Sequence, residues 1–207
     1  MDRLERIPLF PLTLVLFPGM TLPLHIFEPR YKLMIGRCLS GKIPFGVILA
    51  GEKGIATVGT TAEITQKTRD YEDGRMDILT VGRHAFSLKE LFEDEEYFEA
   101  LVEYPDEPPL SPDPLQQAEL VAQFNRCHIL LFGNAWNSSG ENERFPLSFA
   151  LASLLPLDLV EKQRLLETRG ENARRAFLLE RITLLIPQIT ERRRVRRSAG
   201  GNGHPYN

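Results

Sequence analysis

The heptapeptide HIFEPRY gathers side chains that could do chemistry, because His25, Glu28, Arg30 and Tyr31 lie within it. Together they could form a polar site, but a general base also needs a positioned substrate and a proton donor, which sequence spacing does not supply. The same residues fit a structural role, since glutamate is favoured at a helix N-terminus and arginine can pair with a nearby acid. The pattern favours the structural interpretation, and His25 is kept as a candidate for ligand contact.

The other reactive side chains are isolated. Cys127 and His128 are neighbours, so on a helix they point about 100° apart and do not form a nucleophile and base pair. Cys38 and Cys127 belong to no CxxC motif, which argues against a zinc site or a disulfide scaffold and predicts two buried thiols. His84 and His204 stand alone, and a lone histidine is a poor metal site. The sequence therefore predicts no catalytic residue, no metal and no cofactor.

The apolar opening segment, Ile7 to Ile35, is interrupted by Pro8, Pro11 and Pro18. A signal peptide needs a basic start and an unbroken apolar core, and a membrane helix needs about 20 apolar residues without helix breakers. Neither pattern is present, so we expect a soluble, cytoplasmic protein. Because proline pushes the preceding residue towards extended geometry, the segment predicts extended pieces around one turn: Ile7–Phe10, Thr13–Phe17, the turn Pro18-Gly19, and Leu22–Phe27.

Residues up to about Tyr104 mainly alternate with the period of β-strands. Further strands are predicted at Phe45–Ala50, around Ile64, after an Asp73-Gly74 turn, and at Tyr97–Tyr104. One helix interrupts them, since Pro29 suits a first helical turn and Gly41 can end it. Its apolar residues have helical spacing: Tyr31, Met34, Ile35 and Cys38. About six short strands with one helix indicate an α+β protein built on a small curved sheet or half-barrel.

The proline-rich segment PDEPPLSPDP, residues 105–114, separates this region from a helical one. Asp113 and Pro114 can start a helix that ends at Gly133, and a capping box of Asp158 and Glu161 can start another. Helices are also predicted from about Pro146 to Leu155 and along the stripe Leu178, Ile182, Leu185 and Ile189. The expected organisation is a mainly β lobe (1–104), a junction (105–114), a helical bundle (115–191) and a basic, flexible tail (192–207).

Charge is unevenly distributed along the chain. Five arginines lie between residues 192 and 197, so residues 1–191 carry 20 basic against 28 acidic side chains, a net charge of -8. Eleven carboxylates and no Lys or Arg lie between Glu90 and Glu119, and this region would repel a phosphate backbone. The arginine cluster fits a solvated helix end, because cations are favoured near a helix C-terminus.

Five blocks of the chain, taken in order, resemble the N-terminal substrate-binding domain of the Lon ATP-dependent protease. They are PLFPLTLVLFPGMTLPLHIFEPRY, FGVIL, GTTAEI, DGRMDILTVGRHAF and LPLDLVEKQRLLE. The resemblance extends to about Leu185 and implies a PUA-like curved β lobe followed by a helical lobe. It also implies recognition of protein substrates for degradation, in a wider family that includes the corresponding domain of cereblon.

The chain also departs from full-length Lon. It has no GxxxxGK[ST] phosphate loop, since GEKGIATVGT lacks the second Gly-Lys-Ser/Thr, and it ends where the family's ATPase and Ser-Lys protease modules would begin. The CxxC-bearing zinc domain that carries the drug pocket of cereblon is missing as well. The expectation is therefore a recognition part without catalysis.

Three function classes compete. The leading one is a peptide-binding module, and an adaptor in protein quality control, that offers strand edges and apolar pockets to unfolded or extended protein segments, with a Lon-type protease as a candidate partner. Its predicted contact residues are Phe17, Pro18, Gly19, Leu22, His25, Phe27 and the lone tryptophan, Trp136. The alternative is a nucleic-acid-binding PUA-like protein, for which fold alone is a weak warrant. A small-molecule hydrolase has no motif in its favour. The sequence does not determine the oligomeric state.

Overall fold

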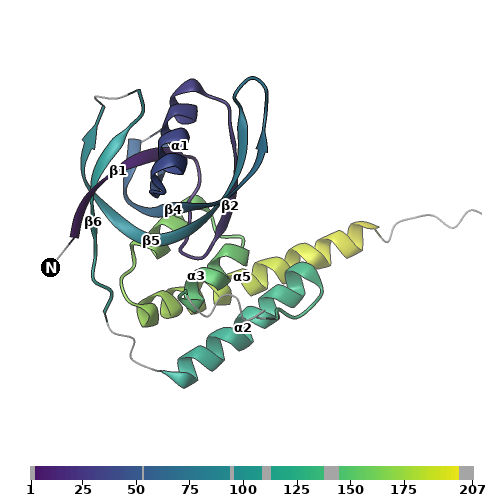
Figure 1. Ribbon diagram of the computed structural model, residues 1–207. Helices are drawn as coiled ribbons and strands as arrows, with labels where there is room; N and C mark the ends of the chain where they lie inside the picture. The colour runs from purple at the N-terminus through teal and green to yellow at the C-terminus, as the bar shows by residue number, and fades with distance from the viewer. Residues whose placement is uncertain (1–2, 53, 94–95, 109–112, 138–144, 201–207) are drawn as a thin grey trace, which may run out of the picture. The chain divides into compact units, whose positions relative to one another are not determined.

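The computed structural model describes residues 3–52, 54–93, 96–108, 113–137 and 145–200 (Figure 1). Its elements are β1 (Arg3–Leu12), β2 (Thr21–Ile26), α1 (Pro29–Gly41), β3 (Phe45–Gly51), β4 (Gly54–Asp70), β5 (Met76–Phe92), β6 (Glu99–Tyr104), α2 (Pro114–Phe132), α3 (Leu147–Leu154), α4 (Leu159–Glu167) and α5 (Glu171–Gly200). The expected mixed α+β class is confirmed. Contacts divide the chain into two compact units: Met1–Pro108 with Asn142–Arg169, and Pro109–Glu141 with Gly170–Asn207.

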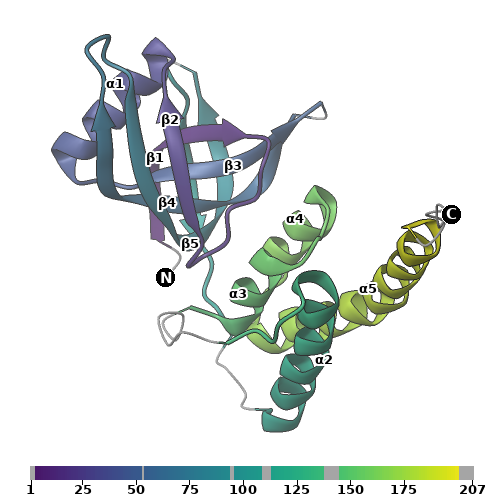
Figure 2. The ribbon, with the colours of Figure 1, turned by 90° about the vertical axis from the view of Figure 1, so that its right-hand side faces the viewer.

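The strands of the first unit close into a ring. The strand order is β2-β5-β4-β3-β1-β6, and an additional pairing between β5 and β6 joins the ends of the last five strands (Figure 2). Only the β1–β3 pairing is parallel. Closure removes most strand edges, and among the described strands β2 keeps a free edge because it pairs with β5 alone, as β4 does beyond Ala62. The predicted half-barrel is thus a closed five-stranded ring with one added strand.

Phe86 fills the centre of this ring and explains two glycines. The ring of Phe86 is fully buried in a cluster with Ile7, Leu9, Ile48, Ala100 and Val102. A Cβ added at Gly46 would lie 2.9 Å from Phe86 Cζ, and one added at Gly59 would lie 2.5 Å from the same atom. Glycine at both positions lets β3 and β4 approach the aromatic ring.

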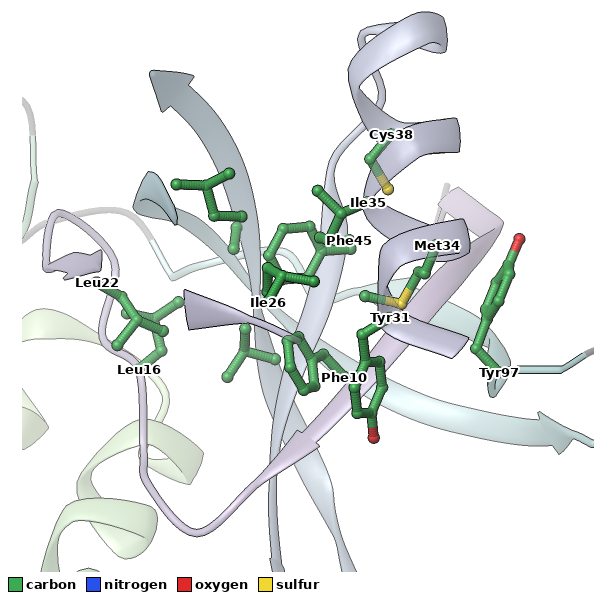
Figure 3. Close-up of a cluster of buried hydrophobic side chains, with 13 residues drawn as sticks. Phe10, Leu16, Leu22, Ile26, Tyr31, Met34, Ile35, Cys38, Phe45 and Tyr97 are labelled. Carbon is green, nitrogen blue, oxygen red and sulfur yellow. The ribbon is translucent and has the colours of Figure 1, made fainter. Parts of the chain in front are cut away.

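A second core joins α1 to the other face of the strands (Figure 3). The predicted bounds of α1 and its four inward residues are confirmed: Tyr31, Met34, Ile35 and Cys38 are buried. The Tyr31 ring stacks on Phe10 of β1, with ring centroids 4.0 Å apart, and Phe45 of β3 lies beside them. Burying one stripe of a helix against a sheet holds α1, and with it the strand β2 that precedes it, in place.

The predicted extended piece Thr13–Phe17 is not a strand. Residues 13–17 form a bend and an irregular loop whose last part, Val15, Leu16 and Phe17, is buried. The loop comes so close to β5 that a Cβ at Gly82 would clash with the Phe17 carbonyl oxygen. Packing of the loop therefore takes the place of strand pairing. The predicted Pro18-Gly19 turn is confirmed, with Gly19 at φ 84° and the Met20 N–H donating to the Phe17 carbonyl at 3.0 Å.

The helices divide differently from the expected single bundle. α3 and α4 belong to the unit of the strands, because Phe149 of α3 stacks on Phe17 at 5.4 Å and Gln163 of α4 donates to the Val58 carbonyl at 3.0 Å. The capping box of Asp158 and Glu161 starts α4 as predicted. Apolar periodicity predicted these helices, but it does not state which surface each apolar face covers.

α2 and α5 form the second unit. Asp113 caps α2 through the Gln116 N–H, Gly133 ends α2 at φ 87°, and Leu120, Phe124 and Cys127 are buried. α5 continues to Gly200, so the arginines of residues 192–197 lie on a helix, as the interpretation of a solvated helix end expects, although the predicted boundaries began a flexible tail at residue 192. The predicted junction is described only at its ends, and residues 109–112 and 201–207 lie outside the described residues. None of the described helices is long and apolar enough to cross a membrane.

Candidate recognition surface along strand β2

The free edge of β2 exposes one row of side chains and one row of backbone groups. Thr21, Pro23 and His25 are exposed, while the alternate residues Leu22 and Ile26 are buried. The Gly82 N–H donates to the Met20 carbonyl at 3.0 Å, so the alternate residues Leu22, Leu24 and Ile26 bond to β5. The N–H and C=O groups of Thr21 and His25 then point to the free edge. Pro23 offers a carbonyl there but no donor.

His25 is held by a carboxylate from the neighbouring strand. Asp77 lies directly opposite His25 in the β2–β5 register, and His25 Nδ1 lies 2.6 Å from Asp77 Oδ1. The second oxygen, Asp77 Oδ2, accepts a 2.8 Å hydrogen bond from the Tyr71 hydroxyl. A carboxylate only accepts, so the Nδ1 of His25 carries the proton and its Nε2 is left facing away from Asp77.

Aromatic rings cover both sides of this pair. The Phe27 ring stacks on His25 at 6.0 Å, and the Tyr71 ring meets His25 edge-on at 5.6 Å. Phe27 is 58% exposed, although it is a large apolar side chain. We call His25, Phe27, Tyr71 and Asp77 the His25 patch. It joins the end of β2 to the hairpin between β4 and β5.

Cations complete the surroundings of the patch. The guanidinium groups of Arg69 and Arg75 lie 4.7 and 4.9 Å from the centre of the Tyr71 ring, which is cation–π geometry. Arg75 also pairs with Asp73 at 2.6 Å. From α1, Lys32 Nζ donates to the Asp73 carbonyl at 2.9 Å and ties the helix to the hairpin.

The hydrogen bonds shift two acidities in the patch. Those donated by His25 first, and then by Tyr71, lower the pKa of Asp77, because they stabilise the charged carboxylate. The hydrogen bond to Asp77 raises the pKa of Tyr71, because the phenol must keep its proton to donate. Asp77 is therefore a carboxylate and Tyr71 a phenol at neutral pH.

This arrangement lacks the parts of a hydrolytic site. A His–Asp pair needs a hydroxyl or thiol on the imidazole to act as a nucleophile activator, and the described partners of His25 are Asp77, Phe27 and Tyr71. Within the described residues, no group of three or more His, Cys, Asp or Glu side chains could hold a metal ion. The patch is an aromatic surface with fixed polar groups, which suits binding.

Of the other residues predicted for a binding rim, two are in the core. Phe17 is 1% exposed and packs on Phe149, and Leu22 is 8% exposed in the α1 core. Pro18 is buried and Gly19 half-buried in the turn before β2. The structure thus brings His25 and Phe27 together at the surface, and places Phe17, Pro18 and Leu22 beneath it.

Trp136 belongs to the second unit, whereas the His25 patch belongs to the first. It is half-buried, its ring meets Phe124 of α2 edge-on with ring centroids 5.5 Å apart, and its backbone N–H donates to Asn125 Oδ1 at 3.0 Å. These contacts hold the Trp136 loop against α2.

The remaining polar residues of HIFEPRY have structural contacts. Arg30 pairs with Glu28 at 2.8 Å and lies over the Tyr31 ring at 4.6 Å. Tyr31 is buried, and burial raises its pKa. Glu28 occupies the N-cap position of α1 without a capping hydrogen bond from its side chain. The structural interpretation of these residues fits the contacts, whereas His25 turns towards β5.

The sequence analysis missed Tyr71 and Asp77. Both flank the predicted Asp73-Gly74 turn, so a signal was present: outward-facing polar residues beside a hairpin turn. Their partner His25 is 52 residues from Asp77, and only the β2–β5 register joins them. Asp77 therefore could not be identified as a partner without the topology.

Comparisons with known proteins agree on one family. The family model of the ATP-dependent protease La (LON) substrate-binding domain matches residues 6–183. Lon protease of Escherichia coli strain K12 is 27% identical over 94% of this chain, and zebrafish (Danio rerio) cereblon is 33% identical over 44% of it. The chain spans about a quarter of the length of the Lon proteases it matches, 27% for the Escherichia coli protein.

Solved structures support the same assignment. The crystal structure of a Lon N-terminal domain protein from Xanthomonas campestris has a TM-score of 0.67 and 26% identity, and covers 85% of this chain and 98% of that one. The N-terminal domain of the Mycobacterium avium complex Lon protease has a TM-score of 0.64 at 16% identity, over 86% and 98% of the two chains, which shows a shared fold. The chain belongs to the family of the ATP-dependent protease La (LON) substrate-binding domain.

Proposed function

We propose that this chain is a non-catalytic recognition module that binds an extended segment of another protein along the edge of β2. The observation that carries the proposal is an unpaired strand edge that ends at an exposed aromatic side chain, Phe27, in a member of a substrate-binding family. A strand added to such an edge gains backbone hydrogen bonds, and neighbouring side chains select its sequence.

The edge supports limited strand pairing. Thr21 and His25 offer both a donor and an acceptor, and Pro23 between them offers only an acceptor. Proline on an edge strand limits open-ended pairing between copies of a protein, so it disfavours aggregation. The backbone bonds are therefore few, and contact with side chains must supply much of the affinity.

The His25 patch supplies that contact. Phe27, His25 and Tyr71 form a continuous aromatic surface whose positions are held by the Asp77 hydrogen bonds. A preordered surface loses little conformational entropy on binding. An apolar or aromatic residue of the bound segment fits this surface best, because exposed Phe27 gains the most from leaving water.

The wider role belongs to the same proposal. We include an adaptor role in protein quality control, in which the bound segment is presented to a protease, with similarity to Lon protease as its support. We also propose that the strand ring is PUA-like, which is supported by its closure and by the family. A cytoplasmic location is part of the same proposal.

Titration of a labelled, unstructured apolar peptide with both ends blocked tests the proposal. Phe27→Ala should weaken binding about tenfold or more, since burial of a phenylalanine side chain contributes roughly 1.5–3 kcal/mol. Thr21→Pro should also weaken it, by removing an edge donor at a position where proline is tolerated. Leu4→Ala is the matched control, because Leu4 is an apolar side chain that is 56% exposed on β1, outside both β2 and the His25 patch. Wild-type affinity in both β2-edge variants would refute the proposal.

A further inference from the structure

One end of the strand ring is hollow. A depression of about 690 Å³ is lined by Glu5 of β1, Thr61 and Glu63 of β4, Arg83 and His84 of β5, Tyr104 of β6, and Lys42 and Pro44 before β3. By strand alternation, Glu5 shares a face with Ile7 and Leu9, and Tyr104 shares one with Val102, so they face the ring interior. The buried cluster around Phe86 fills the ring at its centre. The depression is thus a blind pocket, which admits a side chain or a chain end and excludes a threaded chain.

A β-bulge directs two side chains of β5 into this pocket. The register steps from Thr60 opposite Ala85 to Ala62 opposite Gly82, so Thr61 faces both Arg83 and His84. The Thr61 hydroxyl accepts a 3.1 Å hydrogen bond from the His84 N–H. Bulges re-aim side chains and recur beside functional sites.

The charged side chains of the lining are two carboxylates, Glu5 and Glu63, and two cations, Lys42 and Arg83, and Glu5 has an interaction of its own. Arg83 pairs with Glu63 at 2.6 Å. The Lys42 ammonium has no ion pair or hydrogen bond to any of the described residues. His84 packs edge-on against Tyr104 at 6.3 Å and is exposed, so it can donate a hydrogen bond to a ligand. Lys42 and His84 are therefore the lining groups that can donate to an anionic oxygen.

The backbone of Lys42 has an unusual conformation for a residue with a side chain. It is the one non-glycine with positive φ among the described residues, at φ 51°, and it ends α1 through an N–H bond to the Cys38 carbonyl. Glycine usually occupies this left-handed position because a Cβ is strained there. Strained backbone clusters at binding sites, where a particular side chain is needed.

We propose that this pocket binds the C-terminal carboxylate of a polypeptide, with Lys42 as the ion-pair partner, His84 as a hydrogen-bond donor and Tyr104 against the last side chain. The inference rests on the proposed function and specifies which part of the bound protein is recognised. A carboxylate fits better than an amine, because the cation without a described partner is Lys42. The blind floor excludes a chain threaded through the ring, and the internal-aspartate peptide of the test below separates a chain end from an acidic side chain.

The test compares three peptides of one sequence by fluorescence anisotropy: a free C-terminal acid, its C-terminal amide, and the amide with an internal aspartate. The free acid should bind about tenfold more tightly than the amide, as expected for a charge-assisted hydrogen bond. The aspartate peptide should resemble the plain amide. Equal affinities of acid and amide, or an aspartate peptide that equals the acid, would overturn the proposal.

Variants assign the preference to Lys42. Lys42→Met and Lys42→Gly should both abolish the preference for the acid, and Lys42→Gly should do so while stabilising the fold, because glycine relieves the backbone strain. Lys162→Met is the matched control, since Lys162 lies on α4 in the same unit and outside both the pocket lining and the His25 patch. A preference that persists in Lys42→Gly contradicts the assignment. If the doubly blocked peptide binds through Phe27 but acid and amide are equal, this inference fails while the proposed function stands. If no peptide binds, both fail.

Discussion

Replacing Gly59 by alanine should destabilise the strand ring, because the added methyl group has no room inside it. Its Cβ would lie 2.5 Å from Phe86 Cζ and 2.5 Å from the Val47 carbonyl oxygen. The Phe86 ring could turn, but the carbonyl belongs to the backbone of β3 and can move only with the strand. Overpacking of this kind costs about 1–3 kcal/mol, and about 2 kcal/mol would raise the equilibrium constant for unfolding roughly 30-fold.

Gly51→Ala is the matched control for this change. Gly51 lies in the same pair of strands, and no atom lies within 4 Å of an added Cβ there. Where alanine fits without strain, the substitution stabilises a protein by about 0.4–1 kcal/mol, because it restricts the unfolded chain. The two alanines should therefore act in opposite directions.

The two buried thiols give an assay for each unit. Cys38 of α1 is 1% exposed in the first unit, and Cys127 of α2 is fully buried in the second. Burial raises the pKa of Cys38 to about 12, so its thiol reacts only after the unit opens. Thiol labelling across a urea series, read for each cysteine by mass spectrometry, should show a lower midpoint for Cys38 in Gly59→Ala. Cys127 serves as the internal reference. An unchanged Cys38 midpoint would refute the packing of Phe86 described above.

Two further predictions concern charge. The lowered pKa of Asp77 contributes stability that is present above the unfolded value near 3.9 and is lost as the pH falls through the folded value. Asp77→Asn should remove this acid-side dependence, and NMR titration of the Asp77 carboxyl should give a midpoint below 3.9. Apolar peptide binding should change little with salt, whereas single-stranded nucleic acid held by five arginines would show a log–log slope of about -3.5. Deleting residues 192–207 should abolish any binding of nucleic acid and leave peptide binding unchanged. A truncated chain that binds RNA and does not bind peptides would refute the proposed function.

Local signals predicted the helix ends correctly. Pro29 and Gly41 bound α1, Asp113 caps α2, and the box of Asp158 and Glu161 starts α4, as predicted. Each signal involves residues within one or two turns, so the chemistry that makes a cap is visible in a short window. The inward stripe of α1 was predictable for the same reason.

Features that depend on distant contacts were not predictable. Residues 13–17 have the composition of a strand, but Phe17 packs on Phe149 and its carbonyl approaches Gly82. The pairing of β5 with β6 closes the ring. The alternation of Tyr97–Tyr104 predicts a strand and its two faces, but it does not specify which strand pairs with it or in which register. His25 and Phe27 were identified because they lie in one segment, whereas Asp77 was missed because topology alone brings it there.

The length of β5 explains how one small unit can present two distinct surfaces. Before the bulge at Arg83 and His84, β5 pairs with β2 and carries Asp77, which holds His25 at the free edge. After the bulge, β5 pairs with β6 and closes the ring. The bulge residues themselves line the blind pocket. Asp77 and His84 are seven residues apart, which is about 23 Å along a strand, so the two surfaces are separated by the span of a short extended peptide. A module built in this way can contact a segment and its end through different parts of one strand.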